Sequence, residues 1–173
     1  MAGLIKPSYA ASVALAVTAL HSLAASQTWI AGWTSASVTN STPYADFLIG
    51  GTFTSHASNR AAGSINVYVV GFLNDTPTIP ATSSGTLGTE GAVAFADTYR
   101  RDSLVRLLTS IAVDATASAI YTFPQTGIAQ LFGGRVPNAW ALMVAHNIST
   151  TTTAGLAAAG SALYYTPVMD QYT

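Results

Sequence analysis

Cysteine is absent from this chain of 173 residues, and only 8% of its residues are Asp, Glu, Lys or Arg. Without cysteine the chain can form neither a disulfide nor a cysteine-ligated zinc site, and it has no thiolate nucleophile. A typical soluble domain is about 25% charged, and charge normally keeps a protein solvated and separate from its neighbours. So low a charge predicts a chain that is covered by other chains in an assembly.

Basic residues are too few to form a surface for nucleic acid or for an anionic membrane. The net charge is −1 and Lys6 is the single lysine, so the sequence has no basic patch of the kind that binds phosphate backbones. Arg100, Arg101 and Arg106 are interleaved with two aspartates, which favours a local cluster of ion pairs over a phosphate site. No apolar run approaches the roughly 20 residues that a membrane-spanning helix needs.

The N-terminal region shares some features with a secretory signal. Lys6 precedes an apolar run over residues 10–20, and small residues follow at 22–25. Pro7 interrupts the basic segment of such a signal, and His21 ends the apolar run early. Within that run larger and smaller side chains alternate, which is typical of a strand. We therefore expect a strand here, with a secreted protein as an alternative.

Strand patterns separated by Gly, Pro, Asn and Ser extend along the rest of the chain. The clearest covers residues 65–72, where both faces are apolar, so we expect a central strand that is covered on both sides. Segment 92–101 fits a helix or a strand, and 127–132 resembles one helical turn before a tight turn at Gly133 and Gly134. Residues 74–90 form a long connection. Further strands are expected over 27–38, 44–54, 104–113, 119–123, 139–146 and 162–168, with Leu104, Leu107, Ile111 and Trp140 as core candidates.

About eight or nine short strands with regular turn signals predict an all-β fold. We expect a single-domain antiparallel β-sandwich, jelly-roll-like in architecture, over residues 13–168. Residues 1–12 would form an N-terminal arm and residues 169–173 a C-terminal tail. Both lie outside the strand pattern, so they are suited to holding neighbouring chains.

No catalytic, cofactor-binding or metal-binding residue is predicted. His21, His56 and His146 have no partner at a metal-ligand spacing, and a hydrogen-bonded role at a strand end is expected for His146. No strained nucleophile turn accompanies the many serines. The acidic residues are scattered through loops and strand ends and form no obvious pair for glycosidase chemistry; they are Asp46, Asp75, Glu90, Asp97, Asp102, Asp114 and Asp170.

Aromatic side chains leave a second function open. In a β-sandwich they can form platforms for sugar rings, and they are also what sheets and interfaces favour. Trp29 and Trp33 lie in polar surroundings, so they are the stacking candidates of a carbohydrate-binding protein used in host adhesion. The other candidates are Tyr44, Tyr68, Tyr121, Trp140, Tyr164, Tyr165 and Tyr172, of which Tyr172 could instead anchor a neighbouring chain.

Several segments, in order along the chain, resemble small virion structural proteins of tailed bacteriophages, of the capsid-decoration or head-associated β-sandwich kind. They are 22–26, 46–51, 67–71, 110–114, 132–140, 144–147 and 160–165. The resemblance implies that Gly133, Gly134, Pro137 and Trp140 mark a structural turn and the strand that enters the core. It supplies no catalytic residues.

The resemblance and the composition lead to one expectation. The protein would be a non-enzymatic virion protein without cofactors, assembled in the host bacterial cytoplasm. It would act as a capsid decoration or cement protein that binds the major capsid protein or other virion proteins in many copies. A symmetric homo-oligomer such as a trimer is expected, since burial between copies stabilises the folded state by mass action.

Overall fold

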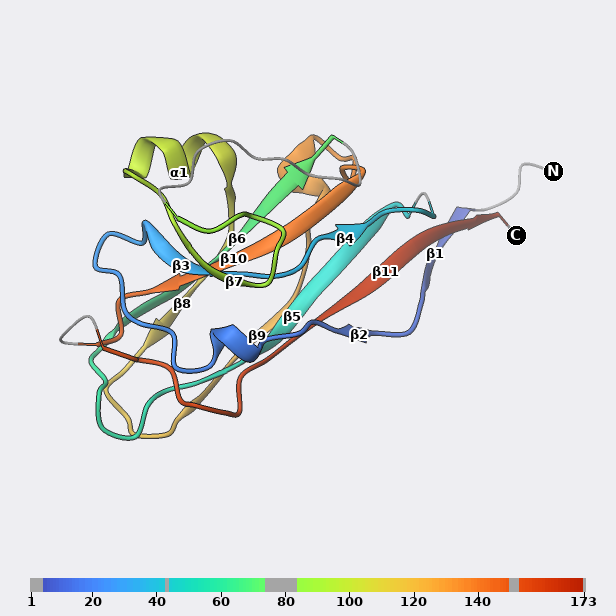
Figure 1. The fold of residues 1–173 in the computed structure, drawn as a ribbon. Helices are drawn as coiled ribbons and strands as arrows, with labels where there is room; N and C mark the ends of the chain where they lie inside the picture. The colour runs from blue at the N-terminus through green and yellow to red at the C-terminus, as the bar shows by residue number, and fades with distance from the viewer. Residues whose placement is uncertain (1–4, 43, 74–83, 150–152, 173) are drawn as a thin grey trace.

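The computed structural model describes residues 5–42, 44–73, 84–149 and 153–172, which form two packed antiparallel sheets (Figure 1). The described residues also include the helix α1 (Thr98–Leu104) and the short 3-10 helices η1 (Thr18–Leu20) and η2 (Ala129–Phe132). The strands are β1 (Ile5–Tyr9), β2 (Val13–Ala14), β3 (Ala31–Thr34), β4 (Val38–Thr39), β5 (Asp46–Thr54), β6 (Gly63–Phe72), β7 (Gly91–Ala94), β8 (Arg106–Val113), β9 (Ile120–Gly127), β10 (Ala139–His146) and β11 (Ala162–Tyr172).

The strand order is that of a jelly roll. Sheet I has the order β1–β11–β5–β9, with β2 also beside β11, and sheet II has the order β7–β3–β10–β6–β8, with β4 beside β10. The chain crosses from sheet II to sheet I between β4 and β5 and returns to sheet II at β6. After β8 it changes sheet at every step, to β9 in sheet I, β10 in sheet II and β11 in sheet I. Such crossings let both sheets contribute one apolar face to a shared core. The expected all-β sandwich is confirmed.

The main core lies between the sheets and follows from the period-2 pattern of the strands. Phe47, Ile49 and Phe53 of β5 point inward from sheet I, while Trp140 and Leu142 of β10 point inward from sheet II. Alternate residues of one strand face opposite sides of a sheet, so each strand contributes every second residue. All eight residues of β10 are buried, as the sequence predicted for 139–146.

A second apolar cluster covers the outer face of sheet II. Tyr68 and Val70 of β6 and Met143 of β10 point away from the main core and pack against Val93 and Phe95. Val93 belongs to β7, the edge strand of sheet II beside β3, and Phe95 follows it, while α1 lies over the sheet in Figure 1. Sheet II is therefore buried on both faces, which confirms the prediction for the strand over 65–72.

Helix α1 is held over the outer face of sheet II by its first and last turns. Asp97 caps its N-terminus, because the Asp97 carboxylate accepts a hydrogen bond from the Arg100 amide at 2.8 Å. In the last turn, the Arg101 guanidinium lies 5.4 Å from the centre of the Tyr68 ring. Arg101 also donates to the Thr28 carbonyl oxygen at 3.0 Å. The ambiguous segment 92–101 thus contains part of a strand and part of a helix.

Several local predictions are confirmed. Residues 129–132 form the expected helical turn, and Gly133 and Gly134 follow it with φ of 71° and 87°, conformations that favour glycine. The glycine pair within β5 marks a register shift against β9, between Ile49 and Gly51. Part of the long connection, residues 74–83, lies outside the described residues.

Other predictions are wrong, and each has a physical reason. The apolar run 12–20 is a strand only at β2 and then turns into η1. β9 continues through Pro124, because a proline is tolerated at the outer edge of a sheet. Leu107 is 49% exposed, since a β-bulge in β8, where Leu108 is the extra residue between the partners of Val67 and Tyr68, turns Leu107 out of the core.

The chain termini are also more ordered than the predicted arms. Residues 5–9 and 168–172 pair with each other as β1 and the end of β11, with Ile5 opposite Tyr172 and Tyr9 opposite Val168. This pairing, together with the division of 27–38 into β3 and β4, raises the strand count above the eight or nine expected. The domain and its arms thus share one continuous sheet.

Candidate interaction surface

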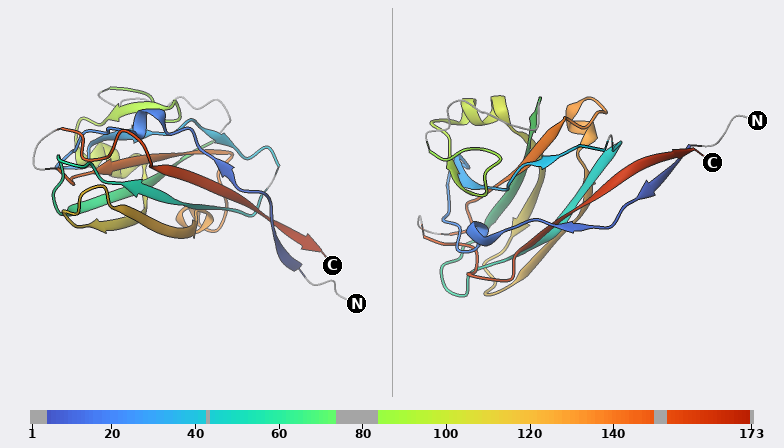
Figure 2. Two further views of the ribbon diagram at one scale, coloured as in Figure 1. Left: turned by 90° about the horizontal axis from the view of Figure 1, so that it is seen from below. Right: turned by 45° about the vertical axis from the view of Figure 1, so that its right-hand side comes forward.

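The terminal ribbon, defined as β1 paired with residues 168–172 of β11, extends away from the body of the sandwich. The pairing of β5 with β11 ends at Asp46 and Val168, so beyond this point β1 is the one strand that pairs with β11. All three ribbon views show the two strands leaving the body together (Figures 1 and 2). An isolated two-stranded ribbon is only marginally stable in water, so a partner that covers it would stabilise it.

The two faces of the terminal ribbon differ in polarity. Directly opposite residues share a face, so Ile5, Pro7 and Tyr9 lie on one side together with Val168 and the exposed Asp170. Lys6 and Ser8 lie on the other side with Met169 and Gln171. Ile5 is 56% exposed and Tyr9 is 62% exposed. Fully burying a large apolar side chain contributes about 1.5–3 kcal/mol. The apolar face is therefore suited to contact with another protein.

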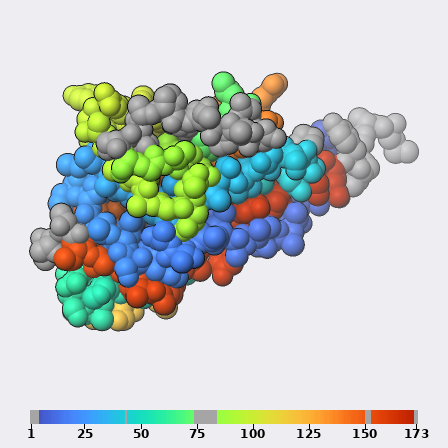
Figure 3. Space-filling model, in the orientation of Figure 1, coloured from blue at the N-terminus to red at the C-terminus, as the bar shows by residue number. Residues whose placement is uncertain are grey.

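The apolar face of the terminal ribbon continues into the outer face of sheet I. Tyr164 of β11 lies on this outer face opposite Ala14 and is 44% exposed. Its neighbours across β5 and β9 include Gly50, Thr52 and Thr122, which are small or hydroxylated. Figure 3 shows β1, β2 and β11 at the surface of the molecule. Unlike sheet II, this face has no apolar cluster packed over it from the part of the chain that the structure describes.

The three histidines lie apart and have structural roles. His146 is fully buried, and its Nε2 donates to the Leu23 carbonyl oxygen at 2.9 Å. Burial lowers the pKa of His146 to about 4, although the bond to Leu23 opposes this, so the ring is neutral near pH 7. This matches the hydrogen-bonded strand-end role expected for it. His56 Nδ1 accepts from the amides of Ser58 and Asn59, at 3.0 Å each.

His21 is half-buried and contacts the Ser161 carbonyl oxygen through Nε2 at 3.2 Å. Within the described ranges, no three His, Asp or Glu residues are grouped so that they could hold a metal ion.

The acidic side chains mostly hold the backbone in place. Asp46 Oδ1 accepts from the amides of Ile128 and Ala129 at 2.9 and 2.8 Å, which fixes η2 against β5. Glu90 Oε1 accepts from Trp33 Nε1 and from the Ala19 amide, both at 2.8 Å. These bonds satisfy buried donors and leave no pair of carboxylates arranged around a common space. Asp75 lies outside the described residues.

Asp114 accepts hydrogen bonds from the Tyr121 hydroxyl and from the Thr116 amide. The bond from Tyr121 is the main reason that the pKa of Asp114 is lowered.

The expected ion-pair cluster of the arginines forms only in part. Arg100 lies 3.7 Å from the Asp97 carboxylate, and Arg101 lies 2.8 Å from the Asp102 carboxylate. Arg106, which was expected to join them, begins β8 and makes no ion pair with any other described residue.

The tryptophans are not arranged as a sugar platform. Trp33 and Trp140 are completely buried, and Trp29 is half-buried against the second apolar cluster. Trp140 packs edge-on against Tyr165, with ring centres 5.5 Å apart, and tilts against Phe47 at 5.4 Å. Trp33 is therefore not a stacking residue in this conformation. The side chain of Tyr172 lies outside the described residues.

The remaining tyrosines mostly support the fold as well. Tyr44 packs edge-on against Phe47, with ring centres 5.4 Å apart. Tyr68 is 5% exposed beneath Arg101, and the Tyr121 hydroxyl is bonded to Asp114. Among the tyrosines expected as sugar contacts, Tyr164 is the one whose described side chain is largely exposed.

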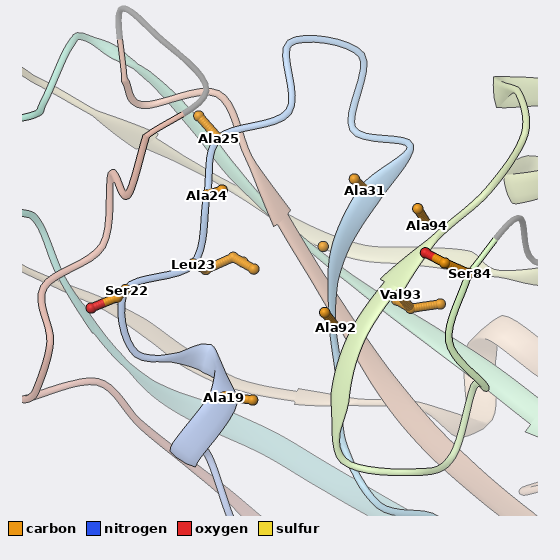
Figure 4. A pocket seen from close by; sticks show the side chains of 11 residues that line it. Ala19, Ser22, Leu23, Ala24, Ala25, Ala31, Ser84, Ala92, Val93 and Ala94 are labelled. Carbon is orange, nitrogen blue, oxygen red and sulfur yellow. The ribbon is translucent and has the colours of Figure 1, made fainter.

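A pocket of about 360 Å³ lies between the segment after η1 and strand β7 (Figure 4). Methyl groups dominate its walls, with Leu23 and Ala24 on one side and Ala92 and Ala94 on the other. Ser22 and Ser84 supply the hydroxyl groups, and none of the described residues that line the pocket has an ionisable side chain. The described lining is therefore mainly apolar.

Comparisons with known proteins add no relative. No protein-family model matches the chain, and no match was found among curated proteins or among solved structures. Among the described helices, none is both long and apolar enough to cross a membrane. The functional interpretation thus depends on the geometry and chemistry of this chain.

The terminal ribbon is the feature that sequence reasoning missed. The arms were expected to hold neighbours, but their pairing with each other was not. A signal was present in the alternation of Ile5, Pro7 and Tyr9 with Lys6 and Ser8, which is a short period-2 pattern. The proline within it made the pattern look like an irregular arm.

Proposed function

We propose that this protein is a non-enzymatic virion structural protein, a capsid decoration or cement protein of a bacteriophage. It would bind the capsid surface in many copies and stabilise the particle. The observation that carries the proposal is the terminal ribbon, where Ile5, Pro7 and Tyr9 are exposed on one face around a single carboxylate, that of Asp170. In this proposal the apolar face of the ribbon contacts the major capsid protein or another virion protein.

Three further features support the proposal. The low charge of the chain suits a protein that is covered by neighbours. Jelly rolls are common in viral capsid domains as well as in lectins, although fold alone is only an analogy for function. The described ionisable groups that form hydrogen bonds bind mainly backbone atoms or each other, an arrangement that stabilises a fold.

The proposal can be tested with particles assembled without this protein. Purified protein is added back, and bound copies and the temperature of particle disruption are measured. We expect saturable binding and a higher disruption temperature. The double variant Ile5→Ser with Tyr9→Ser should lose most of the binding, because it removes the two exposed anchors of the apolar face.

The matched control is Lys6→Ser, which changes the polar face of the same strand and should bind as the wild type does. Equal binding by the double variant would show that the apolar face is not the contact. Particles that resist heat equally well without the protein would contradict a cement role. Specific binding to a glycan array would favour the carbohydrate-binding alternative instead.

A further inference from the structure

The terminal ribbon carries two ionised side chains, one on each of its faces. Asp170 lies on the face of Ile5, Pro7 and Tyr9, and Lys6 lies on the opposite face. Both side chains are exposed, and neither forms an ion pair with any other described residue. The carboxylate of Asp170 is therefore left without a cation on the face that is otherwise apolar.

Asp170 lies at the centre of the exposed part of this face. It is directly opposite Pro7, and side chains in such a pair have Cβ atoms about 4.5–5.5 Å apart. Ile5 and Tyr9 follow Pro7 on the same face in either direction along β1, so they are the diagonal neighbours of Asp170, at roughly 7–8 Å. Three exposed apolar side chains therefore border one carboxylate.

This position determines what happens to the carboxylate when the face is covered. Residues at the centre of an interface lose water, while those at its rim stay solvated. A partner that covers Ile5, Pro7 and Tyr9 therefore also removes water from Asp170. Burying an ionised carboxylate without a cation is strongly unfavourable, and a hydrogen-bonded cation offsets much of that cost. The apolar side chains and Asp170 are thus buried together favourably when the partner supplies a cation.

We propose that the surface which receives the terminal ribbon carries an arginine or lysine that pairs with Asp170, within otherwise apolar surroundings. The inference rests on the proposed function and names the chemistry of the virion protein at that contact. The cationic group would donate hydrogen bonds to the Asp170 carboxylate, and Ile5 and Tyr9 would pack against apolar side chains on either side of it. Arginine fits best, because its planar guanidinium donates two parallel hydrogen bonds to a carboxylate and is enriched at interfaces.

Charge complementarity favours such a protein over other partners. Two ribbons packed with these faces together would bury two carboxylates and no cation, because Lys6 of each copy lies on the opposite face. Like charges that lose water at a shared interface oppose association. The negative charge of Asp170 also opposes contact with phosphate groups of nucleic acid or of an anionic membrane. The ribbon therefore fits a surface of opposite charge on a different protein.

The test measures binding of the full chain to immobilised particles that were assembled without it. Asp170→Asn keeps the size of the side chain and removes its charge. It should weaken binding about thirtyfold or more, mainly through faster dissociation, because the cation of the partner then loses its counter-charge at a buried contact. Asp170→Arg should weaken binding further, since it places two cations together.

Two controls separate this contact from a general effect of charge. Lys6→Gln removes the other charge of the ribbon, on the opposite face. Asp102→Asn removes one negative charge from α1, which lies over sheet II, so it changes the net charge by the same amount as Asp170→Asn. Both controls should bind within about twofold of the wild type, because isolated surface charges contribute little.

The outcomes distinguish this inference from the proposed function. Asp170→Asn binding as tightly as the wild type, or more tightly, would overturn the inference. If Ile5→Ser with Tyr9→Ser still lost binding in that case, the proposed function would stand. Self-association of the free chain that Asp170→Asn weakens would assign the face to a second copy and overturn the inference as well. No binding of the wild-type chain to the particles would contradict the proposed function, and the inference with it.

Discussion

Sheets I and II have the same kind of inner face and very different outer faces. The outer face of sheet II is covered by described parts of the connection from β6 to β8, which place Leu87, Phe95 and Val105 in one apolar cluster with it. The outer face of sheet I is not covered in this way, and its termini extend as a ribbon with exposed Ile5 and Tyr9. Sheet II is therefore buried on both faces by residues of its own chain, while the described part of sheet I keeps an exposed outer face.

Under the proposed function, this difference would let a weakly charged chain fold alone and still present a surface for assembly. The apolar residues that secure the fold are concentrated in the two clusters around sheet II. The apolar residues available for binding, Ile5 and Tyr9, lie in the terminal ribbon, where side chains contribute little to the stability of the fold. Substitutions in the two regions should then separate stability from binding.

The largest effect is expected for Phe95→Ala, in the cover of sheet II. Phe95 is 2% exposed, and truncating a buried phenylalanine typically costs about 3–5 kcal/mol of unfolding free energy. Chemical denaturation should show this loss. A loss below about 1 kcal/mol would mean that the cover is not part of the cooperative fold, and the contrast between the sheets would disappear.

Acid should weaken sheet II through His146. Its pKa is about 4 in the folded state and about 6.5 in the unfolded state, so the unfolded state binds the proton more tightly. Stability is fully present above about pH 6.5 and falls as the pH drops towards 4, by up to about 3 kcal/mol. Unfolding free energies measured over this range test the prediction, and His146→Gln should flatten the dependence. An unchanged slope in that variant would assign the effect to other groups.

Destabilising helix α1 without truncating a buried side chain should reduce the unfolding free energy by a smaller amount. Asp97→Ala removes the N-cap of α1, which typically costs about 1 kcal/mol. Hydrogen exchange should increase first in α1 and not in β5 or β11. Uniform acceleration across both sheets would show that α1 and sheet I open together.

The smallest effect on stability is expected in the terminal ribbon. Tyr9→Ser removes a side chain that is 62% exposed, so the unfolding free energy should change by no more than about 0.5 kcal/mol. Thermal or chemical unfolding of the free protein measures this. A loss comparable with that of Phe95→Ala would mean that the ribbon packs on its own chain, which would remove the basis for a binding role.

The parts that could be predicted from the sequence were those with local patterns. Alternation identified the strand over 65–72 and its two covered faces, and the apolar run 139–146 identified β10. The prediction that Leu107 lies in the core was wrong, because a β-bulge changes the face to which a side chain points and cannot be recognised from composition. Trp33 was misjudged too, because its polar neighbours hid the bond from its indole to Glu90, which is 57 residues away.

The sequence by itself determined the all-β class, the scarcity of charge, the absence of cysteine chemistry and the positions of most strands. These properties follow from composition and from patterns a few residues long. Only the tertiary structure decided that residues 5–9 pair with residues 168–172, and that the described residues cover the outer face of sheet II and not that of sheet I. Such outcomes depend on contacts between residues far apart in the chain, whose partners no local pattern specifies.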